Sequence, residues 1–194
     1  MSLYRSQKKT DLQFKRICMF INEHRDLMKK LFNIKVNLSS LDLMRSDCSS
    51  HFIRMMDDMD IHHDWIQFEI TETVATEYNA GLGMVIDGFM AVGVRLCLDD
   101  FGSGYANLNT VMRLPFSAIK IDRTLLFDIC NDKKRAMFYQ SIVETFHRMG
   151  YSIVSEGVET EEEMSLLSSW GVDMIQGYYF SRPLCEEKLL EKIS

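Results

Sequence analysis

The stretch VRLCLDDFGSGY occupies residues 94–105 and contains the pattern that decides the fold of this chain. A mostly apolar run, Val94–Leu98, is followed at once by the carboxylates Asp99 and Asp100. Short apolar runs of this kind are typical of strands that are buried on both faces. The two glycines that follow, Gly102 and Gly104, let backbone N–H groups approach a phosphate closely. The stretch therefore predicts a buried strand whose carboxyl end presents acidic side chains, followed by a flexible loop.

Five further segments of the chain have the same apolar character. They are Ile34–Leu38, Ile66–Ile70, Ala118–Ile121, Ser152–Ser155 and Met174–Gln176. Stretches with the apolar spacing of helices lie between them, and the pattern from Thr160 to Glu163 is that of a capping box at a helix start. Strands that alternate with helices indicate βα units and a parallel sheet. We therefore predict an α/β protein with about six parallel strands.

Polar residues lie at or near the carboxyl end of every predicted strand. In chain order they are Asn37, Glu69, Asp99 with Asp100, Lys120, Glu156 and Gln176. In a (β/α) barrel this end carries the active site, because the loops that follow the strands converge there. A single buried carboxylate is more often a structural hydrogen-bond acceptor, but six successive strand ends have no such simple explanation.

Carboxylates that are packed together repel one another and require protons or a cation. Carboxylate and amide oxygens favour Mg²⁺ or Mn²⁺ over zinc. Lys120 has two interpretations at this stage. It is either a counter-ion for the carboxylates or a residue that orients or deprotonates an attacking water.

Composition excludes several classes of protein. The 194 residues include 22 basic and 28 acidic side chains, which gives a net charge of −6 and argues against a nucleic-acid duplex as partner. No apolar run approaches the ~20 residues that a membrane span requires. The five cysteines are scattered singly, which is typical of reduced thiols and predicts a cytoplasmic protein.

Seven motifs together resemble the EAL domain family. They are residues 36–39, 69–72, 99–105, 114–115, 119–123, 156–160 and 176–184. The resemblance extends from about residue 10 to the C-terminus. It implies a barrel phosphodiesterase that opens one 3′–5′ phosphodiester of cyclic di-GMP and gives linear pGpG. It also implies two divalent ions, Mg²⁺ or Mn²⁺, that hold the attacking water.

The resemblance also implies a role for individual residues. The residues that resemble metal ligands are Asn37, Glu69, Asp99, Asp100 and Glu156. Lys120 resembles the residue that positions or activates the water, and Glu156 and Glu159 complete the catalytic set. Gln176 and Gly177 resemble substrate-binding residues. Glu72 resembles the anchor of the loop that contains Phe101, Gly102, Ser103 and Gly104 and ends at Tyr105.

The chain departs from the family pattern at its beginning. The Glu-Ala-Leu triplet that names the family, whose Glu is a metal ligand, does not occur in the sequence. We therefore expect an incomplete TIM-like (β/α) barrel of about six strands that lacks the first two strands of the EAL barrel. Residues 1–9 are interpreted as a tag or disordered start, and residues 10–194 as a partial EAL domain.

The missing triplet leaves two functional hypotheses. One is a cyclic di-GMP phosphodiesterase whose turnover is impaired, because a two-metal site that loses a ligand loses its bridging water. The alternative is a catalytically inactive EAL-like module that binds cyclic di-GMP or a protein partner as a regulator. Unpaired strand edges at the gap predict a homodimer or a strand-exchanged dimer, or coverage of the gap by residues 1–12. A fused upstream sensory or GGDEF module is a further predicted partner.

Overall fold

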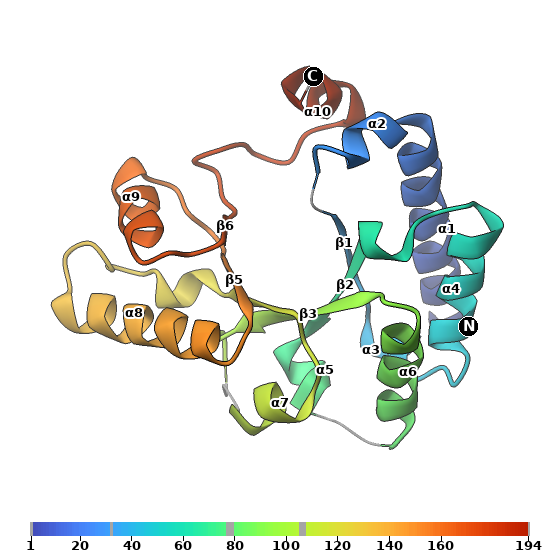
Figure 1. Cartoon of the computed structure of the whole chain (residues 1–194), viewed down its shortest axis with the longest axis horizontal. Helices are drawn as coiled ribbons and strands as arrows, with labels where there is room; N and C mark the ends of the chain where they lie inside the picture. Colours follow the sequence, from blue (N-terminus) through green and yellow to red (C-terminus); the bar gives the residue numbers. More distant parts are fainter. Residues whose placement is uncertain (1, 32, 77–79, 105–107, 194) are drawn as a thin grey trace. The chain divides into compact units, whose positions relative to one another are not determined.

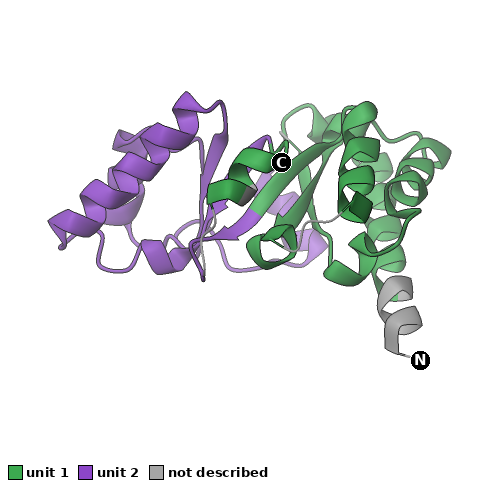
Figure 2. Cartoon of the chain, turned by 90° about the horizontal axis from the view of Figure 1, so that it is seen from below, with its two compact units in different colours: residues 1–98, 107–116 green, residues 99–106, 117–194 purple. Residues whose placement is uncertain are grey.

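The computed structural model (Figure 1) describes residues 2–31, 33–76, 80–104 and 108–193. It contains two compact units, which we call unit 1 and unit 2 (Figure 2). Unit 1 comprises Met1–Leu98 and Asn107–Phe116, and unit 2 comprises Asp99–Ala106 and Ser117–Ser194. The acidic pair Asp99 and Asp100 therefore belongs to unit 2.

Six strands follow one another in the sheet in the order β1-β2-β3-β4-β5-β6. Their bounds are β1 Ile34–Asn37, β2 Ile66–Thr71, β3 Arg95–Phe101, β4 Ala118–Ile121, β5 Ser152–Ser155 and β6 Met174–Ile175. Pairing is parallel between β1 and β2 in unit 1, and between β4, β5 and β6 in unit 2. This is the strand order of consecutive units of a (β/α) barrel. The predicted α/β class, an incomplete barrel of six strands, is confirmed.

The strand β3 is longer than the sequence pattern predicts. It continues beyond Leu98 through both aspartates to Phe101. The carbonyl of Phe101 accepts a hydrogen bond from the N–H of Asp122, at 3.0 Å, which ties the end of β3 to the segment after β4. The two carboxylates therefore project from a strand and not from a loop.

Helices connect the strands. Their bounds are α1 Ser2–Glu23, α2 Arg25–Met28, α3 Ser40–Leu43, α4 Cys48–Asp58, α5 Glu72–Thr76, α6 Ala80–Ala91, α7 Leu108–Arg113, α8 Lys133–Arg148, α9 Glu161–Ser169 and α10 Glu186–Ile193, with the 3₁₀ turns η1 His63–Trp65 and η2 Arg123–Leu125. The predicted capping box is present, since Thr160 accepts from the Glu163 N–H and Glu163 accepts from the Thr160 N–H. None of the described helices has both the length and the apolar character that a membrane crossing requires.

The core of unit 1 forms around Phe68 on β2. Its ring centroid lies 5.6 Å from that of Phe14 on α1, 5.4 Å from that of Phe52 on α4 and 4.7 Å from that of Phe89 on α6. Successive side chains of a strand point to opposite faces. The neighbours of Phe68 on β2, Gln67 and Glu69, therefore lie on the face of the strand that these helices do not cover.

The core of unit 2 forms between α8 and the strands β4 and β5. All four residues of β4 are buried. The buried Tyr139 hydroxyl on α8 donates a hydrogen bond to the buried Ser155 hydroxyl at the end of β5, at 2.7 Å. Phe146 on α8 packs edge-to-face against Phe101 at the end of β3, with centroids 5.0 Å apart. These contacts hold the ends of β3 and β5 in place.

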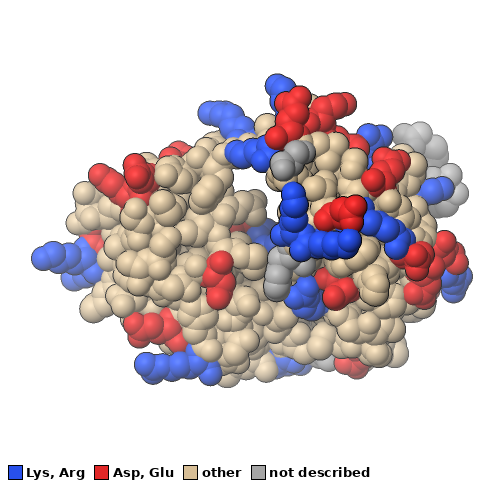
Figure 3. Space-filling model, turned by 45° about the horizontal axis from the view of Figure 1, so that its top comes forward, with Lys and Arg blue, Asp and Glu red and all other residues tan. Residues whose placement is uncertain are grey.

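On the face drawn in Figure 3, Lys and Arg side chains lie among Asp and Glu side chains and do not form one continuous basic patch.

We predict that Phe68→Ala destabilises the protein by about 3–5 kcal/mol, because it removes a buried ring that three other rings surround. Unfolding in urea, followed by circular dichroism, measures this loss. Phe127→Ala is the matched control, since the Phe127 side chain is 69% exposed and its removal is expected to cost less than about 0.5 kcal/mol. Equal losses for the two variants would contradict the assigned core.

Candidate metal centre and substrate groove

Three carboxylates lie together in unit 2. Asp99 and Asp100 come from β3, Glu156 follows β5, and each offers an oxygen within 4.8 Å of the others. The Lys120 ammonium on β4 lies 2.8 Å from Asp99 Oδ1 and 2.6 Å from Glu156 Oε1. Asp99 and Lys120 are buried, whereas Glu156 is partly open to solvent. Four predicted site residues from three strand ends are thus brought together.

The carboxylates outnumber the ammonium in this cluster. Burial is the largest influence on Glu156 and raises its pKa above the ordinary value of 4.5. Lys120 acts in the opposite direction, and the charges of Asp99 and Asp100 add to the increase. A buried group with excess negative charge favours either a proton or a cation. The three oxygen donors fit a hard divalent cation such as Mg²⁺ or Mn²⁺.

The backbone after Asp99 adopts an uncommon conformation. Asp100 has a φ of 60°, in the left-handed region that non-glycine residues seldom occupy. The Asp100 N–H donates to the Asp99 carboxylate at 3.0 Å, which supports this turn. Strained backbone of this kind is concentrated at functional sites. It directs the two adjacent carboxylates to the same cluster.

The loop after β3 packs against η2. Gly102 has a φ of 92°, and a Cβ at this position would lie 2.5 Å from Leu125 Cδ1. The Thr124 hydroxyl donates to the Gly102 carbonyl at 3.2 Å. Gly102 is therefore required by both conformation and space. Ser103 and Gly104 are exposed, and Tyr105 lies outside the described residues.

A groove of about 210 Å³ begins at the cluster in unit 2. Its lining residues are Asp122, Arg123, Glu156, Gly157, Glu159, Gln176, Gly177 and Tyr178. The predicted residues Glu159, Gln176 and Gly177 therefore share one groove with Glu156. A Cβ at Gly177 would overlap the backbone of Val158, so a larger side chain would displace this wall.

Sequence reasoning assigned no role to Arg123. This residue lines the groove and also an adjoining cavity of about 490 Å³, which has Phe127 and Arg135 in its wall. The signal was present, because Arg123 ends the motif at residues 119–123. The sequence does not show that Arg123 lies near Glu159, because this proximity depends on how the segment after β4 folds.

Unit 1 holds the other predicted ligands. Asn37 on β1 is the register partner of Glu69 on β2, so these two residues lie side by side. Glu69 is 3% exposed, and its Oε1 lies 3.8 Å from the Lys35 ammonium. Glu72 is a buried residue in the first turn of α5. The metal-ligand roles of Asn37 and Glu69 and the loop-anchor role of Glu72 stay predictions.

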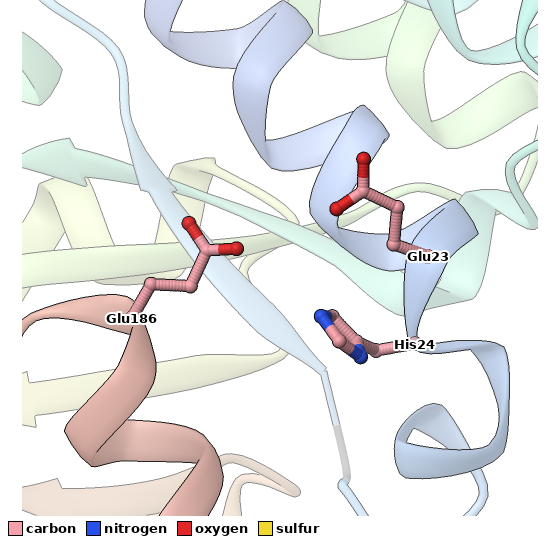
Figure 4. A group of neighbouring side chains, drawn as sticks. All are labelled: Glu23, His24 and Glu186. Carbon is pink, nitrogen blue, oxygen red and sulfur yellow. The ribbon is translucent and has the colours of Figure 1, made fainter.

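Figure 4 shows another set of metal-ligand residue types. Glu23 is the last residue of α1, His24 follows it, and Glu186 is the first residue of α10. The first two belong to unit 1 and the third to unit 2, and we assign no site to them.

Comparison with known proteins identifies a family. The EAL domain model matches residues 7–183 of this chain. The cyclic di-GMP phosphodiesterase PA2567 of Pseudomonas aeruginosa is 30% identical over 156 residues, which are 80% of this chain and 27% of that protein. The chain thus spans about a quarter of the length of this curated relative.

Solved structures give the same result. PaMucR phosphodiesterase in complex with c-di-GMP has a TM-score of 0.85 at 28% identity, covering 96% of this chain and 75% of that chain. Klebsiella pneumoniae BlrP1, in a complex with manganese and cyclic di-GMP, has a TM-score of 0.78 at 27% identity, covering 87% of this chain and 43% of that chain.

The raised pKa of Glu156 predicts a pH dependence of stability. The folded state binds the carboxyl proton of Glu156 more tightly than the unfolded state does. The protonated side chain therefore contributes fully to the stability of the folded state below pH 4.5, and this contribution is lost as pH rises through the folded-state pKa. Glu156→Gln cannot ionise. In the presence of a chelator, the wild type is therefore expected to lose stability relative to Glu156→Gln as pH rises from about 4 to about 7. The free energy of unfolding of Glu156→Gln minus that of the wild type increases over this range.

Urea titrations at several pH values measure this difference. Glu191→Gln on α10 is the control, because Glu191 is exposed and its substitution is expected to show no such trend. A difference for Glu156→Gln that does not change with pH would contradict the assigned environment of this carboxylate.

Proposed function

This chain belongs to the EAL domain family, and from that premise we propose that it is a cyclic di-GMP phosphodiesterase domain with a divalent-cation site. The observation that carries the proposal is the contact of Lys120 with both Asp99 and Glu156, beside a groove lined by Glu159 and Gln176. The relatives named above act on or bind cyclic di-GMP, which supports this substrate.

Asp99, Asp100 and Glu156 are proposed to hold the cation in unit 2, and Asn37 and Glu69 are proposed ligands in unit 1. Bound Mg²⁺ or Mn²⁺ supplies Lewis acidity toward a phosphate and lowers the pKa of water. The manganese in the BlrP1 complex supports a divalent ion, although it does not choose between Mg²⁺ and Mn²⁺ for this chain.

The residues of the chain itself bind and orient the reactants. Lys120 holds the oxygens of Asp99 and Glu156 in fixed positions, and it is the residue that we propose to orient the attacking water. Glu159 and Gln176 line the groove as hydrogen-bonding groups for the substrate, and Gly177 forms part of the same lining. Water adds one oxygen to phosphorus as one 3′ P–O bond breaks. A proton of the water goes to the leaving 3′ oxygen, and the single product is linear pGpG with a free 3′-hydroxyl and a 5′-phosphate.

A second candidate is a module that binds cyclic di-GMP, or a protein partner, without turnover. The absence of the Glu-Ala-Leu triplet from the 194 residues favours it. The loss of a ligand from a two-metal site reduces catalysis far more than it reduces binding, because the reacting water must be placed accurately.

The remaining partners stay proposals. The length of the relatives supports a fused sensory or GGDEF module. A cytoplasmic location fits the substrate of the relatives and stays a prediction.

Dimerisation is proposed from the strand edges. Within the described residues, β1 and β6 are the ends of the strand order, so each has one edge without a strand partner. Exposed edges favour pairing with another chain. We expect light scattering after size exclusion to give twice the chain mass of 22.6 kDa, as a homodimer or strand-exchanged dimer. A stable monomer of this mass would contradict the prediction.

Asp99→Ala tests the catalytic proposal. We expect the wild type with Mn²⁺ to convert cyclic di-GMP to pGpG, measured by chromatography, and Asp99→Ala to reduce kcat/KM by about 100-fold or more. Glu191→Ala is the control and is expected to retain wild-type turnover. Calorimetry with Ca²⁺ in place of Mn²⁺ measures binding separately. Binding without turnover would support a module that binds cyclic di-GMP as the second candidate. The absence of both binding and turnover would contradict the phosphodiesterase proposal and leave the module that binds a protein partner.

A further inference from the structure

A lysine that belongs to none of the predicted site residues lies beside a predicted metal ligand in unit 1. Lys35 is the register partner of Gln67, just as Asn37 is the register partner of Glu69. Between them, Val36 is the partner of Phe68, whose ring contacts the helices. Because side chains alternate along a strand, Lys35, Asn37 and Glu69 share the face opposite those helices.

The Lys35 side chain forms an ion pair on this face. Its Nζ lies 3.8 Å from Glu69 Oε1, and the two side chains are 22% and 4% exposed, respectively. Charges interact more strongly at such a depth than at the surface, because solvent screens them less. A carboxylate that the family resemblance assigns to a cation therefore has the Lys35 side chain as its neighbour.

This ammonium differs from Lys120 in its place in the fold. Lys120 comes from β4 and contacts Asp99 and Glu156 in unit 2, where three carboxylates leave negative charge in excess. Lys35 comes from β1 and contacts Glu69. Lys35 therefore places positive charge beside a predicted metal ligand on the neighbouring strand.

We infer that Lys35 is a built-in competitor for divalent cations at Glu69, which weakens the binding of a cation to the β1–β2 ligands. This inference rests on the proposed function, since it assumes a divalent-cation site. A divalent ion that approaches Glu69 meets the positive charge of Lys35 and must either displace the ammonium or bind beside it. Lys35 thus determines how much free metal the protein needs.

The test measures Mn²⁺ binding to the whole chain, from the electron paramagnetic resonance signal of free Mn²⁺. Lys35→Met is expected to bind the most weakly held Mn²⁺ about tenfold more tightly than the wild type, because a positive charge near its ligand has been removed. Lys35→Arg retains the charge and is expected to show no gain. In the double variant with Glu69→Gln the gain is expected to disappear, because Lys35 acts through Glu69.

Lys15→Met is the matched control for net charge. Lys15 is exposed on α1, and its loss changes the net charge by the same amount without touching Glu69. We expect this variant to bind Mn²⁺ as the wild type does. A gain equal to that of Lys35→Met would overturn the inference, because it would show a general effect of charge.

Two outcomes separate this inference from the proposed function. In the first outcome, Asp99→Ala weakens Mn²⁺ binding, but a folded Lys35→Met binds Mn²⁺ within twofold of the wild type. This outcome would overturn the inference alone. No Mn²⁺ binding by any variant or by the wild type would overturn the metal site and the inference together. If Lys35→Met does not give the wild-type circular dichroism spectrum, Lys35→Gln provides the same neutral side chain at this position, and the same criteria apply.

Discussion

Negative charge gathered at the ends of parallel strands is the constraint on which this structure depends. Carboxylates cannot be buried close together unless positive charge is near, because their repulsion adds to the cost of leaving water. In unit 2 the Lys120 ammonium contacts two of the three carboxylates directly. The short strand β4 that carries it is buried throughout its length. The position of Lys120 within the cluster therefore follows from the packing of β4.

Sequence reasoning found the features that local chemistry determines. Strands buried on both faces are visible as apolar runs, and the Thr160 capping box is visible because its two hydrogen bonds lie within four residues. The extension of β3 through Asp99 and Asp100 was not visible, since aspartate is unfavourable in strands and only tertiary contacts override that preference. The rings around Phe68 come from three separate helices, and no local pattern indicates which of them meet.

The site shows the same division between local and tertiary information. Glu156, Glu159 and Gln176 were recognisable from motifs, but Arg123 became a groove residue only when η2 was placed beside the loop after β5. Close approach explains this placement, since a Cβ at Gly157 would overlap the Arg123 side chain. Lys35 was hidden for a different reason. It lies in an apolar run, and only the register of β1 with β2 shows that it faces Glu69.

The ion pairs give the buried carboxylates a role in the stability of the fold. An ammonium stabilises a buried carboxylate whether or not a metal ion is bound, so Asp99, Glu156 and Glu69 each have a structural reason to be present. Removal of any of these carboxylates would take an ion-pair partner from Lys120 or Lys35. A chain that had lost catalysis would therefore keep the same carboxylates as an active enzyme.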